Sequence, residues 1–300
     1  MTADNPADFP YRPVADAQSS RVRKRYWATA IGLQKVDGLE PSPYLRELAS
    51  MNVAGELSLS ETSARIKTYH RSEASAPHPS SGEREADLVS QRIVEMLAAR
   101  SFQFMPDMLA AIHANLFQDL DSTVYRPGKY KREALMKQEE ILNGDSIVYG
   151  DPFLIDRALD LLFEREEGFD YGFSFDRDKT VRFSSFIANV WQVHPFEEGN
   201  TRTVAVFAEL YLDHLGFDVA NSPFEDNAKY FRDALVRANY RNAKAGIKPT
   251  IDYLASFFEN LLCNKDNVLR SSDLVCTPLF DDPSLLRNID SAQAINGRQA

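Results

Sequence analysis

One short segment of the sequence, His194 to Thr203, concentrates the groups that chemistry at a phosphate requires. It reads His-Pro-Phe-Glu-Glu-Gly-Asn-Thr-Arg-Thr. His194 is a candidate general base, because imidazole titrates near neutral pH. Glu198 offers a hard oxygen ligand for Mg2+, which proteins bind through one or two carboxylates plus substrate phosphates. Arg202 can bind a phosphate through paired N–H groups. The segment therefore predicts nucleotide chemistry at a phosphate.

The flanking residues predict how this segment is positioned. Apolar residues recur at three- and four-residue steps over residues 183–193, which indicates a helix with one buried face. Pro195 is expected to end that helix, because a proline disfavours helical backbone at the residue before it. The pair Gly199-Asn200 predicts a tight turn, and Thr201 is expected to cap a second helix over residues 204–215. The exposed N–H groups of such a helix start can bind an anion.

This segment resembles the signature of the Fic (filamentation induced by cAMP) family, His-Pro-Phe-x-acid-Gly-Asn-x-Arg. The matching positions are His194, Pro195, Phe196, Glu198, Gly199, Asn200 and Arg202. Members of that family are mostly adenylyltransferases, which move AMP from ATP to a hydroxyl side chain of a target protein. The resemblance implies ATP as the substrate, Mg2+ as the cofactor, and a target protein with a Tyr, Ser or Thr hydroxyl as the partner.

The resemblance also implies a role for each residue of the segment. His194 would deprotonate the target hydroxyl, Glu198 would hold Mg2+, and Phe196 would anchor the loop in the core. The positions that would bind the nucleotide and its phosphates are Gly199, Asn200, Thr201 and Arg202.

The sequence departs from the family pattern at two positions. Many members have glycine in place of Thr201, and a second arginine, used for the terminal phosphate of ATP, in place of Ala205. Three alternatives therefore stay open. They are adenylyl transfer, phosphoryl transfer as in the related death-on-curing proteins, and a nucleotide-binding or interaction module without catalysis.

Composition bounds the class of protein. A chain of 300 residues predicts one main domain with an appendage. The net charge of −10 argues against a nucleic-acid or anionic-membrane partner, since only residues 21–25 form a basic cluster. Two distant cysteines, Cys263 and Cys276, favour a reducing compartment. Without an apolar run that could span a membrane or a signal peptide, the expected location is the cytoplasm.

The N-terminal part predicts a short lead-in, residues 1–19, and a module of three helices, residues 20–70. A Ser-Pro pair at Ser42 and a Ser-Glu pair at Ser60 mark the starts of the second and third helices. Three short helices bury little surface alone, so they are expected to pack against another part of the chain.

This module resembles the small antitoxins that pair with class I Fic toxins, on the phrases at residues 36–43 and 55–58. In those antitoxins a glutamate after the first helix reaches into the Fic site and displaces productive ATP. The aligned residue here is Asp37, followed by Gly38, and the preceding hydroxyl position is Leu33. The resemblance implies an inhibitory Asp37 within the same chain. A plain turn at the helix end is an equally good interpretation of Asp37.

The remaining chain predicts a linker over residues 71–82, a Fic-type helical domain over residues 83–262 and a loosely packed tail over residues 263–300. Ser80 followed by Glu83 is a capping-box spacing ahead of the first helix of that domain. The predicted fold is mainly α, with one small β-hairpin.

The hairpin is predicted between residues 130 and 149. Residues 130–136, 139–142 and 146–149 are expected to be extended, with the turn signal Asn143-Gly144-Asp145 before the last of them. In Fic proteins this region is a flap that aligns an extended segment of the target by strand addition. The residues expected to contact a target are Lys137, Glu139, Glu140 and Ile141. A surface hairpin whose charges only confer solubility is the alternative.

Two further assignments concern single residues. Asn227, Tyr230 and Arg232 are candidates for the adenine end of the pocket, from their position after the signature helix. His113 lies on or beside the apolar face of a helix, so a structural role is expected for it rather than a catalytic one.

Overall fold

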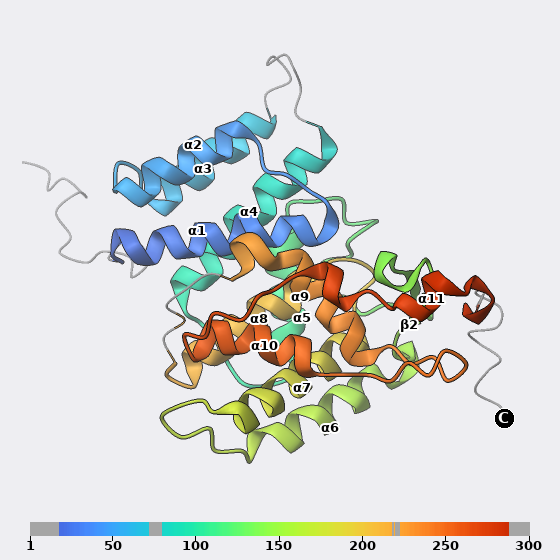
Figure 1. Cartoon of the computed structure of the whole chain (residues 1–300). Coiled ribbons are helices and arrows are strands. Elements are labelled where there is room, and N and C mark those ends of the chain that lie inside the picture. Colours follow the sequence, from blue (N-terminus) through green and yellow to red (C-terminus); the bar gives the residue numbers. More distant parts are fainter. Residues whose placement is uncertain (1–17, 72–79, 218, 220–222, 288–300) are drawn as a thin grey trace, which may run out of the picture.

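The computed structural model describes residues 18–71, 80–217, 219 and 223–287, and these residues form a mainly helical protein with one small antiparallel sheet (Figure 1). The predicted fold class is confirmed. The helices are α1 Ser20–Gln34, α2 Pro43–Ala54, α3 Leu59–Arg71, α4 Ser81–Ala99, α5 Asp107–Phe117, α6 Ile155–Glu167, α7 Arg177–Val193, α8 Asn200–His214, α9 Phe224–Asn239, α10 Asp252–Leu262 and α11 Thr277–Asp281. Short 3-10 turns are η3 Lys35–Asp37, η4 Glu140–Leu142, η5 Pro152–Leu154, η6 Ser271–Leu274 and η7 Pro283–Leu285. The strands are β1 Met136–Gln138 and β2 Ser146–Val148.

Helix α1 belongs to the same hydrophobic core as the rest of the chain. It lies between the α2–α3 pair and the remaining helices (Figure 1), and packs against α4 and α9. Tyr26, Trp27 and Leu33 of α1 are buried in that core. A Cβ at Gly32 would lie 2.2 Å from the carbonyl oxygen of Phe224, so α1 and the start of α9 touch backbone to backbone. The expectation that the N-terminal helices pack against another part of the chain is confirmed.

Helices α7 and α8 enclose the signature segment. Helix α8 is buried along nearly its whole length, which is what a central helix surrounded by others requires. At its far end, Phe207 and Tyr211 pack against the rings of Phe102 and Phe186. The loop between α7 and α8 is therefore fixed at both ends by a rigid scaffold.

The hairpin differs from the prediction in its first half. Strands β1 and β2 pair antiparallel with Lys137 opposite Ile147. Residues 140–142 form the 3-10 turn η4 instead of extended backbone, and residues 130–135 precede the strand. The reason is tertiary, because Ile141 and Leu142 turn inward and become buried, and the carbonyl oxygen of Ile141 accepts a hydrogen bond from the N–H of Cys276.

Within the predicted loosely packed tail, three residues of the segment 263–287 are anchored in the core, and most of the others are exposed or half-buried. Leu274, Cys276 and Leu279 are buried. The side-chain amide of Asn143 donates to the carbonyl oxygen of Leu279, so this segment fastens the hairpin to the core. Residues 288–300 lie outside the described residues.

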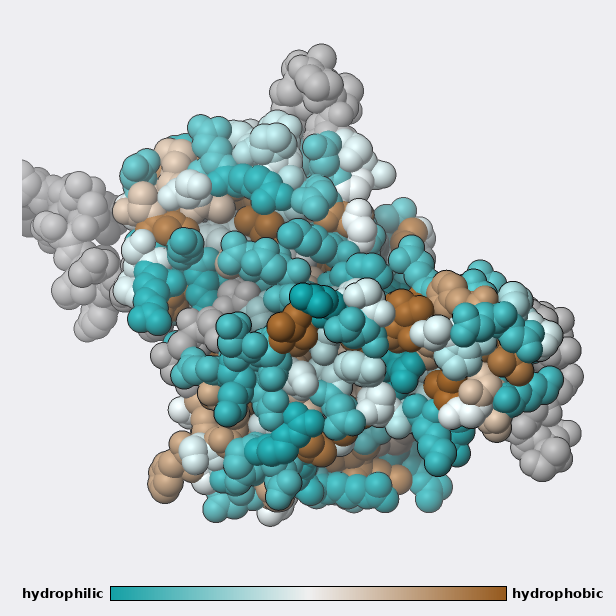
Figure 2. Space-filling model, in the orientation of Figure 1, coloured by the Kyte–Doolittle hydropathy of each residue, from teal (hydrophilic) through white to brown (hydrophobic). Residues whose placement is uncertain are grey.

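The predicted linker largely lies outside the described residues, at positions 72–79. At its edges Arg71 belongs to α3 and Ser81 to α4, so the helices extend further than the sequence suggested. The capping box of Ser80 and Glu83 is present as predicted. Among the described helices, none has the length and hydropathy needed to cross a membrane. The face shown in Figure 2 is mostly hydrophilic, with apolar residues scattered over it.

Candidate functional site

The loop between α7 and α8 is held by hydrogen bonds within the signature segment itself. Helix α7 ends at His194, which has left-handed backbone with φ 50° and ψ 62°. The side chain of Asn200 accepts a hydrogen bond from the N–H of Phe196 (2.9 Å) and donates one to the carbonyl oxygen of Phe196 (2.8 Å). Asn200 therefore closes the loop, using its side-chain oxygen and one of the two N–H groups of its amide.

Gly199 occupies a position that no other residue can take without strain. Its φ is +74°, and an added Cβ would lie 2.2 Å from Cζ of Phe117. Helix α8 begins at Asn200, with Gly199 at its N-cap. The predicted cap at Thr201 is therefore wrong. Thr201 lies in the first turn, where its hydroxyl accepts a hydrogen bond from Nε1 of Trp191 at 3.0 Å and ties α8 to α7.

His113 contacts the buried side of the loop between α7 and α8, which agrees with its predicted structural role. Its Nδ1 accepts a hydrogen bond from the N–H of Gly128 at 2.9 Å, so its Nε2 carries the proton and donates to the carbonyl oxygen of Glu198 at 3.1 Å. Its ring stacks on Phe196, with centroids 3.8 Å apart. Burial lowers the pKa of His113 to about 4, so the ring is neutral at physiological pH.

His194 is positioned as a neutral base. Its ring stacks on that of Tyr149 at a centroid distance of 3.5 Å. Burial lowers the pKa of His194 well below its ordinary value, and the positive charges of Lys131 and Arg232 act in the same direction. Nδ1 of His194 is buried and has no hydrogen-bond partner among the described residues. A neutral imidazole with a free nitrogen can accept a proton.

The start of α8 offers unpaired donors beside His194. In the described part of the chain, the backbone N–H groups of Asn200, Thr201 and Arg202 have no hydrogen-bond acceptor, and the next one, that of Thr203, donates to Gly199. A helix start leaves such groups pointing away from the helix, where they attract negative charge. His194 and the first two of these residues line a common cavity of about 290 Å3.

The guanidinium of Arg202, the signature arginine, contacts three other side chains, although its Nε has no hydrogen-bond partner among the described residues and meets Asp37 only as an ion pair. Its guanidinium forms an ion pair with Glu85 (2.8 Å) and another with Asp37 (2.9 Å), and it donates to Oε1 of Gln34 (3.2 Å). It also lies over the ring of Phe117. Its side chain is only 1% exposed, whereas that of Asp37 is 23% exposed. Glu85 and Gln34 were missed by sequence reasoning, since neither belongs to a motif.

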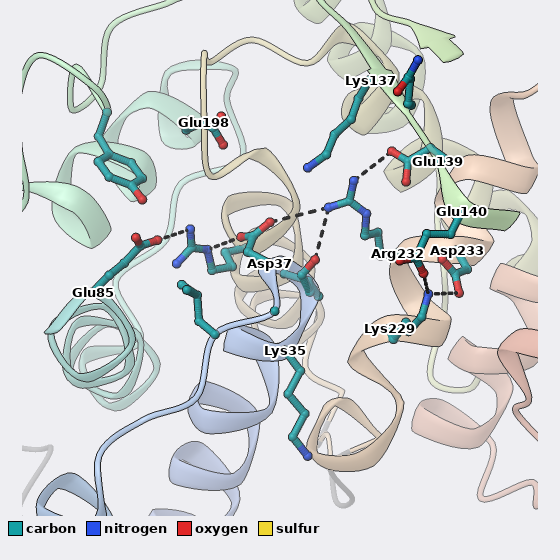
Figure 3. Close-up of a pocket in the computed structure, with 16 residues that line it drawn as sticks. Lys35, Asp37, Glu85, Lys137, Glu139, Glu140, Glu198, Lys229, Arg232 and Asp233 are labelled. Carbon is teal, nitrogen blue, oxygen red and sulfur yellow. Dashed lines mark hydrogen bonds and ion pairs between the residues drawn. The ribbon is translucent and has the colours of Figure 1, made fainter. Parts of the chain in front are cut away.

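Asp37 reaches into the site from the end of α1. It is the last residue of η3 and is followed by Gly38 in left-handed conformation, so the predicted helix-end turn is present. Its carboxylate lies between two arginines, with ion pairs at 2.9 Å to Nε of Arg202 and at 3.5 Å to Arg232. The side chains of Asp37 and Arg232 are labelled in Figure 3. The helix-end turn is confirmed, and the inhibitory role of Asp37 stays a prediction.

A second cavity of about 550 Å3 adjoins the first. Its lining comes from η3, α4, the flap, α8 and α9 (Figure 3). Four residues line both cavities, namely Asp37, Lys137, Glu198 and Arg232. Asp37 thus stands where the two spaces meet.

Glu198 is the one signature carboxylate that faces both cavities. Partial burial raises its pKa, the charge of Lys137 opposes this, and the carboxylate of Asp37 adds to it. Among the described residues there is no cluster of three or more His, Cys, Asp or Glu side chains suited to a metal ion. Glu198 fits the pattern of Mg2+ sites that draw most of their ligands from substrate phosphates and water.

The four residues of the hairpin that were expected to contact a target differ in their exposure to solvent. Lys137 and Glu140 are exposed, and Glu140 pairs with Lys229 at 3.4 Å. Glu139 is buried and pairs with Arg232 at 2.8 Å. Ile141 is buried as well. The expectation that Glu139 and Ile141 contact a target is therefore wrong for this conformation, because tertiary contacts turn both side chains inward.

Of the three residues expected at the adenine end, only Arg232 lines the cavities. The hydroxyl of Tyr230 donates to the carbonyl oxygen of Tyr253, on the opposite side of α9. Asn227 has non-helical backbone and lines neither cavity. The placement of Asn227 and Tyr230 beside the nucleotide is not supported.

Comparison with known proteins finds one family model that matches part of the chain. Residues 103–212 match the family model described as the Fic/DOC family. The matched region includes α5, the hairpin, α6, α7, the signature loop and most of α8. Neither the curated proteins nor the solved structures contain a match.

Proposed function

We propose that this chain transfers a nucleoside monophosphate from ATP to a hydroxyl group of a target protein, and that its N-terminal helices restrain the reaction. The observation that carries the proposal is the placement of His194. A neutral imidazole with an unpartnered Nδ1 lines one cavity with the unpaired N–H groups that begin α8. A general base and an anion-binding helix start are the two parts that transfer to a hydroxyl requires.

The chemistry follows from these groups. His194 takes the proton of the target hydroxyl as its oxygen attacks the α-phosphorus of ATP. The bond from that phosphorus to the bridging oxygen breaks, and pyrophosphate leaves. The N–H groups of Asn200 and Thr201 stabilise the added charge on the phosphoryl oxygens. Glu198 would hold Mg2+, which supplies further charge neutralisation when bound.

The flap provides an edge for the target. Leu135, Lys137 and Glu139 are the positions whose main-chain groups face β2, as shown by the bonds from Tyr149 to Leu135 and from Glu139 to Asp145. The main-chain N–H and C=O groups of Met136 and Gln138 therefore point away from β2. An extended target segment can pair with them by strand addition and bring its hydroxyl toward His194.

Asp37 supports the proposed restraint. Its carboxylate occupies the guanidinium of Arg202, which the resemblance assigns to phosphate binding. A nucleotide would therefore have to displace Asp37 before its phosphates could contact Arg202. Because α1 is part of the common core, deleting residues 1–70 would expose that core, so a point substitution tests the restraint more cleanly.

The test is intact-mass and peptide mass spectrometry on full-length protein. Wild type, Asp37→Ala and Asp37→Ala/His194→Ala are incubated with Mg2+, nucleoside triphosphates and a bacterial lysate. The expected result is a nucleoside-monophosphate mass on a target or on the chain itself, stronger in Asp37→Ala and absent from the double variant. Glu40→Ala serves as the matched control, because Glu40 is a neighbouring acid whose only ion-pair partner within the described residues is the exposed Arg46.

Two outcomes would contradict the proposal. An added phosphate mass that depends on His194 would identify phosphoryl transfer instead. No added mass in any variant, under conditions in which an established Fic enzyme labels its target, would leave a nucleotide-binding module without transferase activity.

A further inference from the structure

We propose that Arg232, on α9, is a second phosphate-binding residue of this site, and that it acts on the phosphates beyond the α-phosphate once Asp37 withdraws. This inference rests on the proposed function. It assigns to α9 a role in nucleotide binding that no signature residue fills.

Arg232 has the position that this role requires. It lines both cavities, and its side chain is 11% exposed. It contacts three residues in two separate segments, η3 and the hairpin region. It donates to the carbonyl oxygen of Val36 in η3 (3.2 Å), forms an ion pair with Glu139 of the flap (2.8 Å), and forms another with Asp37 (3.5 Å) (Figure 3). A guanidinium can hold two acidic groups at once, because it presents five N–H donors in a planar fork.

The carboxylate of Asp37 shows where an anion fits. Its Oδ2 lies 2.9 Å from Arg202 and its Oδ1 lies 3.5 Å from Arg232. One small anion thus bridges two guanidiniums that come from different helices. A phosphate group presents anionic oxygens with similar spacing, so it can replace the carboxylate between the same two arginines.

The charges around the site favour this exchange. Arg202 keeps Glu85 and Arg232 keeps Glu139 when Asp37 leaves, so neither guanidinium becomes an isolated buried charge. Loss of one carboxylate makes the site more positive by one unit. The cavity of about 550 Å3 beside the two arginines has room for a polyphosphate chain.

The arrangement predicts a dependence on the number of phosphates. The α-phosphate belongs at the start of α8, in the cavity of His194, and the following phosphates extend toward Arg202 and Arg232. Removing Arg232 should therefore weaken the binding of ATP and ADP much more than the binding of AMP. Loss of a hydrogen bond between an arginine and a charged phosphate raises Kd roughly 10- to 100-fold.

The experiment is isothermal titration calorimetry of full-length protein with ATP, ADP and AMP, each with Mg2+ and without any target. Asp37→Ala is compared with Asp37→Ala/Arg232→Gln. We expect the Kd of ATP to rise roughly 10- to 100-fold on loss of Arg232 and that of AMP to change less than about threefold. With Asp37 in place, Arg232→Gln should have a smaller effect on ATP, because Asp37 already occupies the arginine.

Two companion variants guard against a folding defect. Arg232→Gln leaves Glu139 buried without its partner, so Asp37→Ala/Arg232→Gln/Glu139→Gln removes the unpaired charge as well. Asp37→Ala/Arg232→Lys keeps the charge but not the fork, and should recover part of the ATP affinity. Lys229→Ala in the same background is the control for general electrostatics, because Lys229 is a cation that lines the same cavity and pairs with the exposed Glu140 and with the buried Asp233.

Three results would overturn the proposal. They are an equal loss of affinity for ATP and AMP, a loss for Lys229→Ala as large as that for Arg232→Gln, and an Asp37→Ala protein that binds no ATP. Binding is measured without transfer, so a protein that binds as expected but labels nothing would contradict the proposed function alone.

Discussion

The loop from His194 to Asn200 and the turn from Lys35 to Asp37 meet at the same cavities, but they are held there in opposite ways. The loop is fixed by its own Asn200 clamp and by the buried His113 beneath it. The turn contributes a carboxylate that is 23% exposed and whose recorded ion pairs go to α8 and α9. The loop is thus built into the fold, whereas Asp37 is the contact that we propose is released when a nucleotide binds. The following predictions test that difference.

The largest expected effect comes from Gly199→Ala. The substitution combines a strained φ of +74° with a Cβ placed 2.2 Å from Phe117, and should lower the free energy of unfolding by roughly 3–5 kcal/mol. Urea unfolding measures it. Gly216→Ala is the matched control, because Gly216 also has positive φ but nothing within 4 Å of an added Cβ, and should cost about 1–2 kcal/mol. Equal costs for both would mean that the loop is not tightly packed.

The next largest effect is a loss of folding stability at low pH, caused by His113 beside the α7–α8 loop. His113 has its pKa lowered from 6.5 to about 4, so the unfolded chain binds more protons between these values and stability falls as the pH decreases. The loss should reach about 3 kcal/mol by pH 4, and His194 adds to it in the same direction. Urea unfolding of wild type and His113→Gln at several pH values checks this. The variant should show a shallower slope, and an unchanged slope would remove His113 as the cause.

A third effect is a loss of folding stability as the pH rises, caused by Glu209 between α1 and α8. Burial raises the pKa of Glu209 to about 7, and its Oε1 accepts a hydrogen bond from Thr29 at 3.0 Å. The folded state prefers the protonated form, so this contribution is present at low pH and is lost as the pH rises through 7. Glu209→Gln should unfold with a free energy about 3 kcal/mol higher than wild type at pH 8 and no higher at pH 4.5. A variant less stable at pH 8 would show that the ionised carboxylate is stabilising.

The smallest expected effect on stability belongs to Asp37→Ala, although it should change activity most in the positive direction. Both arginines keep another carboxylate, so the free energy of unfolding should fall by only about 1 kcal/mol. Urea unfolding and labelling of the same preparation test the two together. A loss above about 3 kcal/mol would place Asp37 in the structural framework and make release implausible.

Local sequence patterns predicted the parts of the site that depend on neighbouring residues. The helix flanking His194, the start of the helix at Ser42 and the capping box at Ser80 all agree with the structure. Each depends on hydrogen bonds and backbone conformations within a few residues, so the sequence alone contains the information. The cap at Thr201 was misplaced by two residues, because left-handed Gly199 begins α8 instead.

Long-range contacts were beyond such patterns. Ile141 and Glu139 were expected to face a target, but Cys276 and Arg232, far along the chain, turn them inward. The buried Leu274 and Leu279 were assigned to a loose tail because they lie on two short elements, the 3-10 turn η6 and the helix α11, whose apolar spacing is irregular. Sequence patterns predict the buried face of a regular helix well, because its apolar residues are periodic. They predict single buried residues in irregular segments poorly.

The sequence by itself determined the order of the signature residues and the helix–loop–helix that presents them, since a histidine, a glycine, an asparagine and an arginine at fixed spacing permit few backbone paths. Only the tertiary structure decided which charges meet there. Glu85, Arg232 and Asp37 come from three helical regions that are distant in sequence, and they converge because α1 packs between α4 and α9. Electrostatic interaction depends on distance in space, so no spacing along the chain could reveal it.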